Sequence, residues 1–458
     1  MALQQDYVLL KNILEQKHPS LYWYTPKDSM DLYFSKYYDL IKDSMTEQQY
    51  AWKVLAPLVA KIQCGHTSVS MSKAYTKWVK KKTFPSFPLY MKIWNDSMLV
   101  MLNMNKDDSL IKKGTLITSV NGLNMNELKD IMFSYLPIDG NANSMNYIRM
   151  SANFPYYHKN IFGISKNYII TYIDSSGSTK SATLPVYMPV KDSAKKKIVK
   201  EANPKITKQK RLDSYRSLKI DSSGKFAVIT LNSFSDGRLR HFFRQSFRKL
   251  KDQNITNLVL DIRLNGGGKV GLSTLLAKYV TRKPFKIADS LYATTNDLAP
   301  YTKYVKGKFL NNLELVFITK KKKDGLFHIS HLEKKTYKPK KNIHYNGNLY
   351  VLTAGPTFSA AALFCNAVKG QEGIKLLGEE TGGGWYGNNG IMIPDIILPS
   401  TKLRVRLPLF RLVQYNHTKK NGSGVVPDIL VETSYDALMK GYDKKMKVAR
   451  ELILGTGL

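Results

Sequence analysis

Strands and helices alternate in the middle of the chain, and this alternation constrains the fold more than any other feature. Short apolar runs of strand length lie at residues 226–231, 258–262, 348–353 and 374–377. Segments of helical length and periodicity lie between them, at residues 239–250, 271–280 and 358–368. Because this order of elements favours a parallel sheet covered by helices, it predicts an α/β core.

Ahead of this core the spacing of the apolar residues changes twice. Between residues 6 and 62 apolar residues recur at helical spacing, and Thr46 and Gln49 form a capping-box pattern at the start of the third predicted helix. We expect that helix to end near Gly65, directly before His66. Residues 84–187 show short or alternating apolar runs between turn signals, which predict a mostly β insert.

These changes predict four segments and an α/β fold that is α+β overall. The segments are an N-terminal helical domain at 1–70, a β-rich domain at 71–190, a basic linker at 191–216 and the core at 217–458. The basic runs at 195–210 and 320–341 are interrupted by proline and acidic residues, so we expect surface linkers and loops there.

The charge of the chain is strongly positive, with 70 Lys and Arg against 35 Asp and Glu among 458 residues. The excess is lysine, 57 against 13 arginines, whereas base reading and bidentate phosphate recognition rely on arginine. We therefore expect no specific nucleic-acid partner, although an anionic envelope surface would attract such a chain.

Other classes of protein are excluded by simple counts. Two cysteines make no disulfide framework. No apolar stretch approaches the roughly 18 residues of a membrane-spanning helix, so no transmembrane segment is expected. The first residues show no charged and then apolar export signal, which indicates that a signal is either lacking or removed.

A glycine-rich turn follows the second predicted core strand, at residues 264–268. Gly266, Gly268 and Gly271 satisfy the spacing of a dinucleotide-binding turn, with Asp289 at a suitable distance. A phosphate-binding P-loop fails because Leu272 occupies its lysine position. A third interpretation is an oxyanion hole, in which the turn's backbone amides stabilise a negatively charged carbonyl oxygen.

Ser359 favours the third interpretation. The strand at 348–353 leads through a short turn into a helix of small residues, which places Ser359 at a helix N-terminus. Free amides and the positive end of the helix dipole stabilise an alkoxide there. The alternative is that Ser359 or Thr357 only caps the helix.

A nucleophilic serine needs a base, and His66 has the most suggestive context of the eight histidines. A histidine at the end of a helix is stabilised as imidazolium, the state that a general base reaches after taking a proton. The alternative is that His66 merely caps that helix. His417 is the reserve base, although its surroundings are typical of a loop.

Four segments in this order resemble the C-terminal processing peptidase (tail-specific protease) family. They are residues 261–268 (DIRLNGGG), 357–361 (TFSAA), 378–384 (GEETGGG) and 424–428 (GVVPD), and residues 110–122 also resemble the core of a PDZ domain. The resemblance implies a ClpP/crotonase-like core with an N-terminal helical cap and a PDZ-like β-rich insert. It also implies that Ser359 attacks a peptide carbonyl, with the amides of Gly267 and Ala360 as oxyanion hole.

The chain also departs from the family pattern. No lysine lies between Lys375 and Lys402, so the Ser-Lys dyad is absent and the chain is more similar to the tricorn-like branch, in which a histidine is the base. That branch has a serine before this histidine, where this chain has Gly65, and a glutamate near residues 421–423, where this chain has none. Glu380, or else Glu379, is the candidate for orienting His66.

The combined prediction is a serine peptidase that cleaves protein or peptide substrates through an acyl-enzyme. Its catalytic residues are expected to be Ser359, His66, Gly267, Ala360 and Glu380. We predict no cofactor and no metal, because no His, Cys and Glu residues have zinc spacing. The alternative is a non-catalytic protein on the same scaffold that binds peptides or lipids. The family resemblance implies a periplasmic or cell-envelope location.

Overall fold

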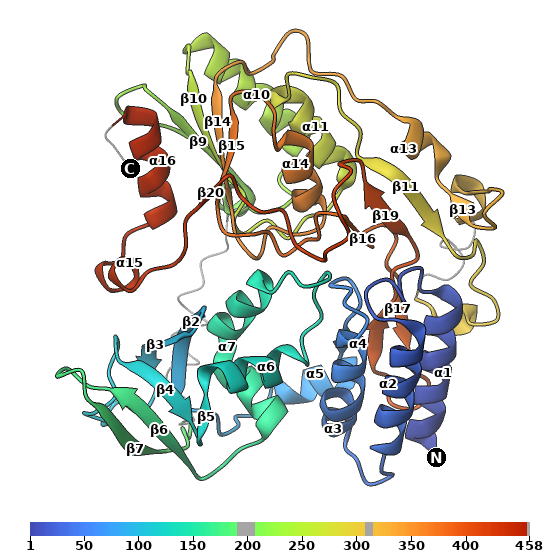
Figure 1. Ribbon diagram of the computed structural model, residues 1–458, viewed down its shortest axis with the longest axis vertical. Helices are drawn as coiled ribbons and strands as arrows, with labels where there is room; N and C mark the ends of the chain where they lie inside the picture. The colour runs from blue at the N-terminus through green and yellow to red at the C-terminus, as the bar shows by residue number, and fades with distance from the viewer. Residues whose placement is uncertain (190–206, 307–314, 456–458) are drawn as a thin grey trace.

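A six-stranded sheet forms the centre of the computed structural model, which describes residues 1–189, 207–306 and 315–455 (Figure 1). The strand order is β20-β15-β14-β10-β9-β8. The strands are β8 (Arg216–Ile220), β9 (Ala227–Leu231), β10 (Asn257–Asp261), β14 (Asn348–Thr353), β15 (Ile374–Gly378) and β20 (Ile429–Leu430). All are parallel except β8, which pairs antiparallel with β9 at one edge. The α/β core that the sequence predicts is confirmed.

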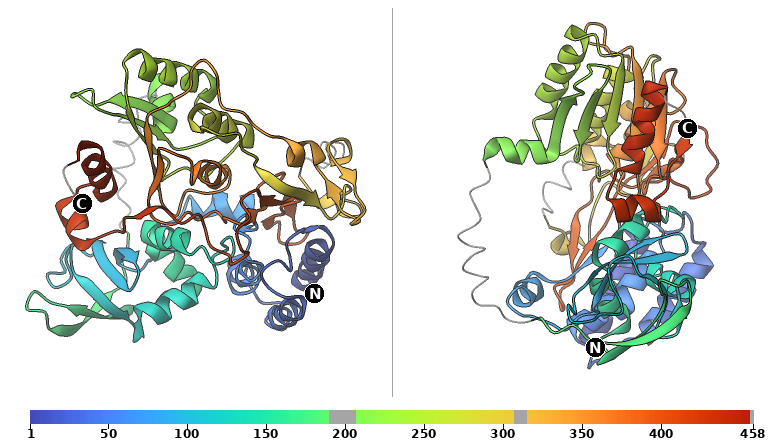
Figure 2. Two further views of the ribbon diagram at one scale, coloured as in Figure 1. Left: turned by 45° about the horizontal axis from the view of Figure 1, so that its top comes forward. Right: turned by 90° about the vertical axis from the view of Figure 1, so that its left-hand side faces the viewer.

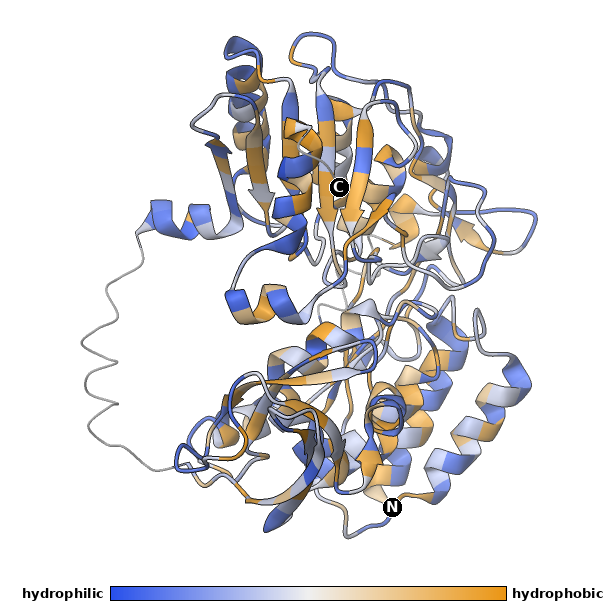
Figure 3. Cartoon of the chain, turned by 60° about the vertical axis from the view of Figure 1, so that its left-hand side comes forward, coloured by the Kyte–Doolittle hydropathy of each residue, from blue (hydrophilic) through white to orange (hydrophobic). Residues whose placement is uncertain are grey.

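Helices cover both faces of this sheet, as its alternating side chains require. Leu258 and Leu260 of β10 pack in one cluster with α10 (Leu239–Asp252), α11 (Val270–Val280) and α14 (Ala360–Val368). Val259, between them, packs in another cluster with Ala449 of α16 (Lys444–Leu454). Figure 3 shows the apolar colour along the central strands, and the polar helix α9 (Lys208–Tyr215) outside them. Successive side chains of β10 therefore serve opposite layers.

The N-terminal helices share the core of the central sheet. They are α1 (Ala2–Lys17), α2 (Lys27–Asp39), α3 (Glu47–Tyr50), a π-helical turn η1 (Ala51–Leu55), α4 (Ala56–Ala60) and α5 (Lys73–Val79). The capping box of Thr46 and Gln49 is confirmed. The expected end of the third helix is wrong, since α4 ends at Ala60 and the backbone turns at Gln63 with φ 54°. The dipole argument for His66 therefore does not hold.

The β-rich region has a hydrophobic core of its own, formed by residues between Phe87 and Leu184. Its sheet has the order β2-β3-β4-β6-β7, with β5 beside β4. The elements are β2 (Leu89–Trp94), β3 (Ser97–Asn103), β4 (Leu116–Val120), β5 (Leu123–Asn124), α6 (Met125–Phe133), α7 (Ser144–Phe162), β6 (Asn167–Ile173) and β7 (Thr179–Pro185). The domain boundaries and the PDZ likeness stay predictions, and most of the 191–216 linker lies outside the described residues.

Two smaller sheets complete the described structure. One has the order β12-β13-β11-β19-β16, and the other has the order β1-β18-β17. Their strands are β1 (Val69–Ser70), β11 (Ala288–Ala293), β12 (Lys320–Lys321), β13 (Phe327–His328), β16 (Gly387–Asn388), β17 (Asp395–Ile397), β18 (Arg404–Arg406) and β19 (Arg411–Gln414). The 320–341 run is therefore more than a surface loop, because it also carries α13 (Ser330–Lys334) and the buried pair His328 and Glu333.

The helical and β-rich regions lie side by side beneath the central sheet (Figure 2). The remaining short elements are η2 (Thr302–Tyr304) and α15 (Tyr435–Lys440). Within the described ranges no helix is both long enough and apolar enough to cross a membrane.

Candidate active site

The two turns that the sequence singles out meet at the carboxyl edge of the central sheet. β10 and β14 are parallel neighbours, with Asp261 opposite Leu352, so the turns that follow them emerge together. Phe358 N donates to Asn265 O at 3.0 Å, and Thr357 Oγ1 donates to Ile262 O at 3.0 Å. These bonds fix the segment before Ser359 to the glycine-rich turn.

Ser359 is the N-cap residue of α14, with φ 54° and ψ −122°. Such backbone angles cost a residue other than glycine about 1–3 kcal/mol, and strain of this size collects at functional sites. The side chain of Ser359 makes no capping hydrogen bond. The capping alternative therefore has no support in the structure, and the hydroxyl is available for chemistry.

His66 reaches the same place from the N-terminal region. Its side chain is 4% exposed, and its ring lies 4.5 Å from the ring of Phe358, the neighbour of Ser359. A Cβ atom on Gly65 would lie 2.8 Å from Phe358 Cζ. The Phe358 ring therefore occupies the space that a side chain at position 65 would need.

Ser359 and His66, the predicted nucleophile and base, both border Gly390. A Cβ atom on Gly390 would lie 2.8 Å from Ser359 Oγ and 3.1 Å from His66 Nε2. The two atoms are thus at most about 6 Å apart, within the looseness of a site without substrate. His66 Nε2 has no hydrogen-bond partner, so it is free to take a proton.

Asp139, from the loop before α7, is the carboxylate beside His66. Its Oδ1 lies 3.7 Å from His66 Nδ1 and accepts from Gly65 N at 2.7 Å, and its Oδ2 accepts from Gly384 N at 3.3 Å. The next loop residues pack on the 421–423 segment, since Asn141 N donates to Gly422 O at 2.7 Å. This contact and the two amides that Asp139 accepts from hold its carboxylate beside His66.

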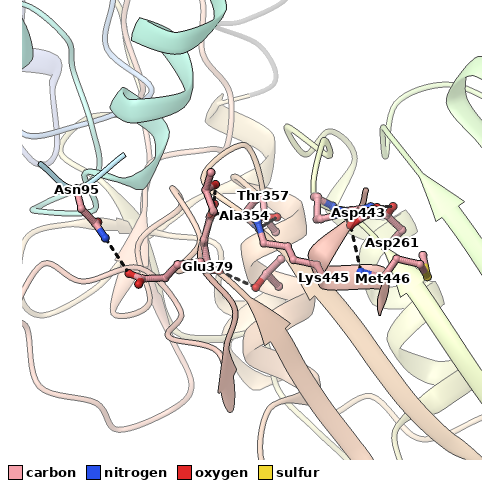
Figure 4. A network of polar contacts seen from close by, with 12 residues as sticks. Asn95, Asp261, Ala354, Thr357, Glu379, Asp443, Lys445 and Met446 are labelled. Atoms are coloured by element: carbon pink, nitrogen blue, oxygen red, sulfur yellow. Dashed lines mark hydrogen bonds and ion pairs between the residues drawn. The ribbon is translucent and has the colours of Figure 1, made fainter. Parts of the chain in front are cut away.

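The expected orienting glutamates point elsewhere. Glu380 accepts from Gly424 N at 2.6 Å, and burial raises its pKa. Glu379 pairs with Lys445 of α16 at 3.1 Å, in the polar network drawn in Figure 4. Among the described residues Asp139, and neither glutamate, lies within ion-pair distance of His66. His417 is an exposed loop residue whose ring lies against Tyr415.

The two predicted oxyanion donors, the amides of Gly267 and Ala360, lie next to Ser359 but differ in their hydrogen bonding. A Cβ atom on Gly267 would lie 2.7 Å from Ser359 Cβ and 2.9 Å from Ala360 N, so the glycine turn touches the start of α14. The amide of Ala360, in the first helical turn, has no intrahelical acceptor. The amide of Gly267 donates to Asn265 Oδ1 at 2.9 Å. An oxyanion would compete with Asn265 for that hydrogen.

Sequence reasoning missed three of these residues. Asp139 and Gly390 carry no motif, and only the fold brings them to Ser359 and His66. Asn388 is buried beside Gly390, with Nδ2 unpaired, so it is a further polar group of the site. Cys64 also belongs to the neighbourhood, because ligand atoms of Cys64, His66 and Asp139 all lie within 4.8 Å of one another.

Comparison with solved structures supports this fold. Mature CPAF in complex with lactacystin is 15% identical over 99% of both chains, with a TM-score of 0.64. Mature CPAF alone is 14% identical over all of this chain and 98% of the other, with a TM-score of 0.62. A candidate peptidase from Parabacteroides merdae is 15% identical over 100% and 98%, with a TM-score of 0.51. At these identities the likeness concerns the fold alone.

The family comparison adds the class of protein. Residues 225–431 match the model of Peptidase family S41, and they span the glycine-rich turn, Ser359 and Gly390. No curated protein matches the chain in sequence. The fold and this match define a peptidase hydrolase. This match confirms the resemblance to the C-terminal processing peptidases that the four motifs predict. Its placement in the tricorn-like branch stays a prediction.

Proposed function

We propose that the protein is a serine peptidase in which Ser359 is the nucleophile and His66 the general base. The observation that carries this proposal is the shared space at Gly390, which Ser359 Oγ and His66 Nε2 both border. The strained backbone of Ser359 and the unpaired state of His66 Nε2 support it. The match to family S41 supports peptides as the substrates of the reaction.

The mechanism follows from these positions. His66 Nε2 takes the hydroxyl proton while Ser359 Oγ attacks the peptide carbonyl. The amide of Ala360, and that of Gly267 once it leaves Asn265, stabilise the oxyanion. The amine then leaves with the proton from His66, and water, deprotonated by the same ring, releases the acyl group from Ser359.

Asp139 is the positioning residue in this proposal. A carboxylate close to Nδ1 fixes the tautomer in which Nε2 is free to accept a proton, and it stabilises the imidazolium that forms. The 3.7 Å between Asp139 Oδ1 and His66 Nδ1 is longer than a hydrogen bond. We propose that it shortens when substrate fills the site, as catalytic hydrogen bonds often do.

A fluorophosphonate probe tests the proposal because it reacts only with an activated serine. We expect labelling of the wild-type chain, with none in Ser359→Ala or His66→Ala. Ser235→Ala is the matched control, since Ser235 is an exposed serine on the other side of the glycine-rich turn, against Gly268. Absence of labelling between about pH 5 and pH 9, the range in which a histidine base titrates, would favour the non-catalytic binding protein. The envelope location stays a prediction.

A further inference from the structure

Both ring nitrogens of His66 lack a hydrogen-bond partner, although the side chain is 4% exposed. A buried polar atom without a partner costs about 1–3 kcal/mol. The role of general base accounts for Nε2, which must stay free for the serine proton. It leaves Nδ1 unexplained in the resting state, because Asp139 Oδ1 is too distant for a hydrogen bond.

The surroundings of Nδ1 have the chemistry of a zinc site. The thiol of Cys64, the ring of His66 and the carboxylate of Asp139 offer sulfur, nitrogen and oxygen atoms within 4.8 Å of one another. Usual zinc bond lengths of about 2.0–2.3 Å place tetrahedral ligand atoms roughly 3.4–3.6 Å apart. The 3.7 Å between Nδ1 and Oδ1 is close to that separation. The two ligand atoms that lie farthest apart must approach each other by about 1 Å to complete the tetrahedral geometry.

The cluster also has the outer support that metal ligands use. Asp139 is held by the amides of Gly65 and Gly384, which fix the direction of its two oxygens. Cys64 is a free and buried thiol, whose pKa burial raises to about 12. When the metal–sulfur bond forms, the proton of this thiol goes to solvent.

We propose that Cys64, His66 and Asp139 bind a zinc ion that reversibly blocks the peptidase. The block rests on the function proposed above, whereas the binding of the ion does not. Zinc on Nδ1 forces the proton of the neutral ring onto Nε2. In that tautomer Nε2 cannot accept the proton of Ser359, and Asp139 is held by the metal. The ion and the catalytic tautomer therefore exclude each other.

Binding is tested first in the Ser359→Ala chain, where catalysis plays no part. Titration with Co²⁺ should give a thiolate-to-cobalt absorption band that saturates at one ion per chain and disappears when Zn²⁺ is added. A second substitution in that chain, either Cys64→Ser or Asp139→Asn, should remove the band. Cys365→Ser is the matched control, because Cys365 is the other buried free thiol and lies on α14, away from the cluster. It should leave the band unchanged.

Inhibition is then measured in chains that retain Ser359. Zn²⁺ should abolish fluorophosphonate labelling, and EDTA should restore it. Relative to its own labelling without metal, Cys64→Ser should need at least tenfold more zinc than the wild type. The proposal is overturned if no cobalt band appears, or if the band survives Cys64→Ser. It is also overturned if the wild type and Cys64→Ser are equally sensitive to zinc. A cobalt band in a chain that the probe never labels would instead overturn the serine peptidase and leave the metal site standing.

Discussion

Oδ1 of Asp139 lies 3.7 Å from Nδ1 of His66, and each side chain is 4% exposed. The two residues come from different regions of the chain, the helical cap and the β-rich insert. This relationship places a negative charge behind the ring that faces Ser359. In the proposed mechanism this relationship gives the orienting role to Asp139, which no motif in the sequence marks.

Asp139→Asn should lower kcat by about 10²–10⁴-fold, because an amide keeps the size of the side chain and loses the charge that stabilises imidazolium. The measurement is the rate of fluorophosphonate labelling or of peptide cleavage at neutral pH. Glu380→Gln is the control, since its amide oxygen can still accept from Gly424 N, and it should stay within about twofold of the wild type. If Glu380→Gln lowers the rate more than Asp139→Asn does, Glu380 and not Asp139 orients His66.

Gly390→Ala should abolish labelling while the protein stays folded. Its methyl group would lie 2.8 Å from Ser359 Oγ and 3.1 Å from His66 Nε2, in the space through which the proton must pass. Gly271→Ala is the control, because a Cβ atom there meets nothing within 4 Å and the helix α11 favours alanine by up to about 1 kcal/mol. Undiminished labelling of Gly390→Ala would show that proton transfer takes another route.

Gly65→Ala should lower the free energy of unfolding by about 1–3 kcal/mol through overpacking against Phe358. Its Cβ atom would lie 2.8 Å from Phe358 Cζ. Phe358→Leu should relieve the clash, so the double variant should be more stable than the sum of the two single effects predicts. Urea unfolding of the four chains measures this coupling. Additive losses would mean that the Phe358 ring does not limit residue 65.

Lowering the pH from about 6.5 should destabilise the fold through His18. Burial lowers its pKa to about 3, and its ring accepts from Ser20 N and contacts Thr67 Oγ1 at 2.8 Å. Between these two pKa values the unfolded chain binds a proton that the folded chain does not. The free energy of unfolding therefore decreases as the pH decreases, by up to about 1.4 kcal/mol per pH unit. His158, whose pKa burial lowers to about 4, acts in the same direction.

The measurement is urea unfolding at pH 7, 6 and 5. His18→Gln can still donate from its amide to Thr67 but does not titrate, so its stability should fall less steeply than that of the wild type. Equal slopes for the two chains would contradict the assignment to His18.

Local sequence signals predicted the parts of the site that depend on local order. The 348–353 strand agrees with β14 residue for residue, and Ser359 stands at the start of α14 as expected. The end of the third helix was mispredicted for a physical reason. Gln63, and not the glycine at position 65, takes the left-handed conformation that usually follows a helix, so the helix ends earlier than the glycine indicates.

Long-range contacts account for what the sequence did not reveal. Asp139 reaches His66 only because the loop before α7 docks on the segment around Gly422. Glu380 is the sequence-based candidate because a carboxylate can fix the imidazole tautomer, yet its carboxylate accepts from the amide of Gly424. The packing of three chain regions decides between these carboxylates, and no local pattern encodes that packing.

The order in which these three regions leave the ribosome has a cellular consequence. His66 and Asp139 are translated first, and Ser359 follows Asp139 by 220 residues. A nascent chain that stops between them thus holds the imidazole and the carboxylate with no alcohol to activate. Under the proposed mechanism, the cell that synthesises this protein is exposed to its cutting activity only after residue 359 has been translated and has packed against the earlier regions.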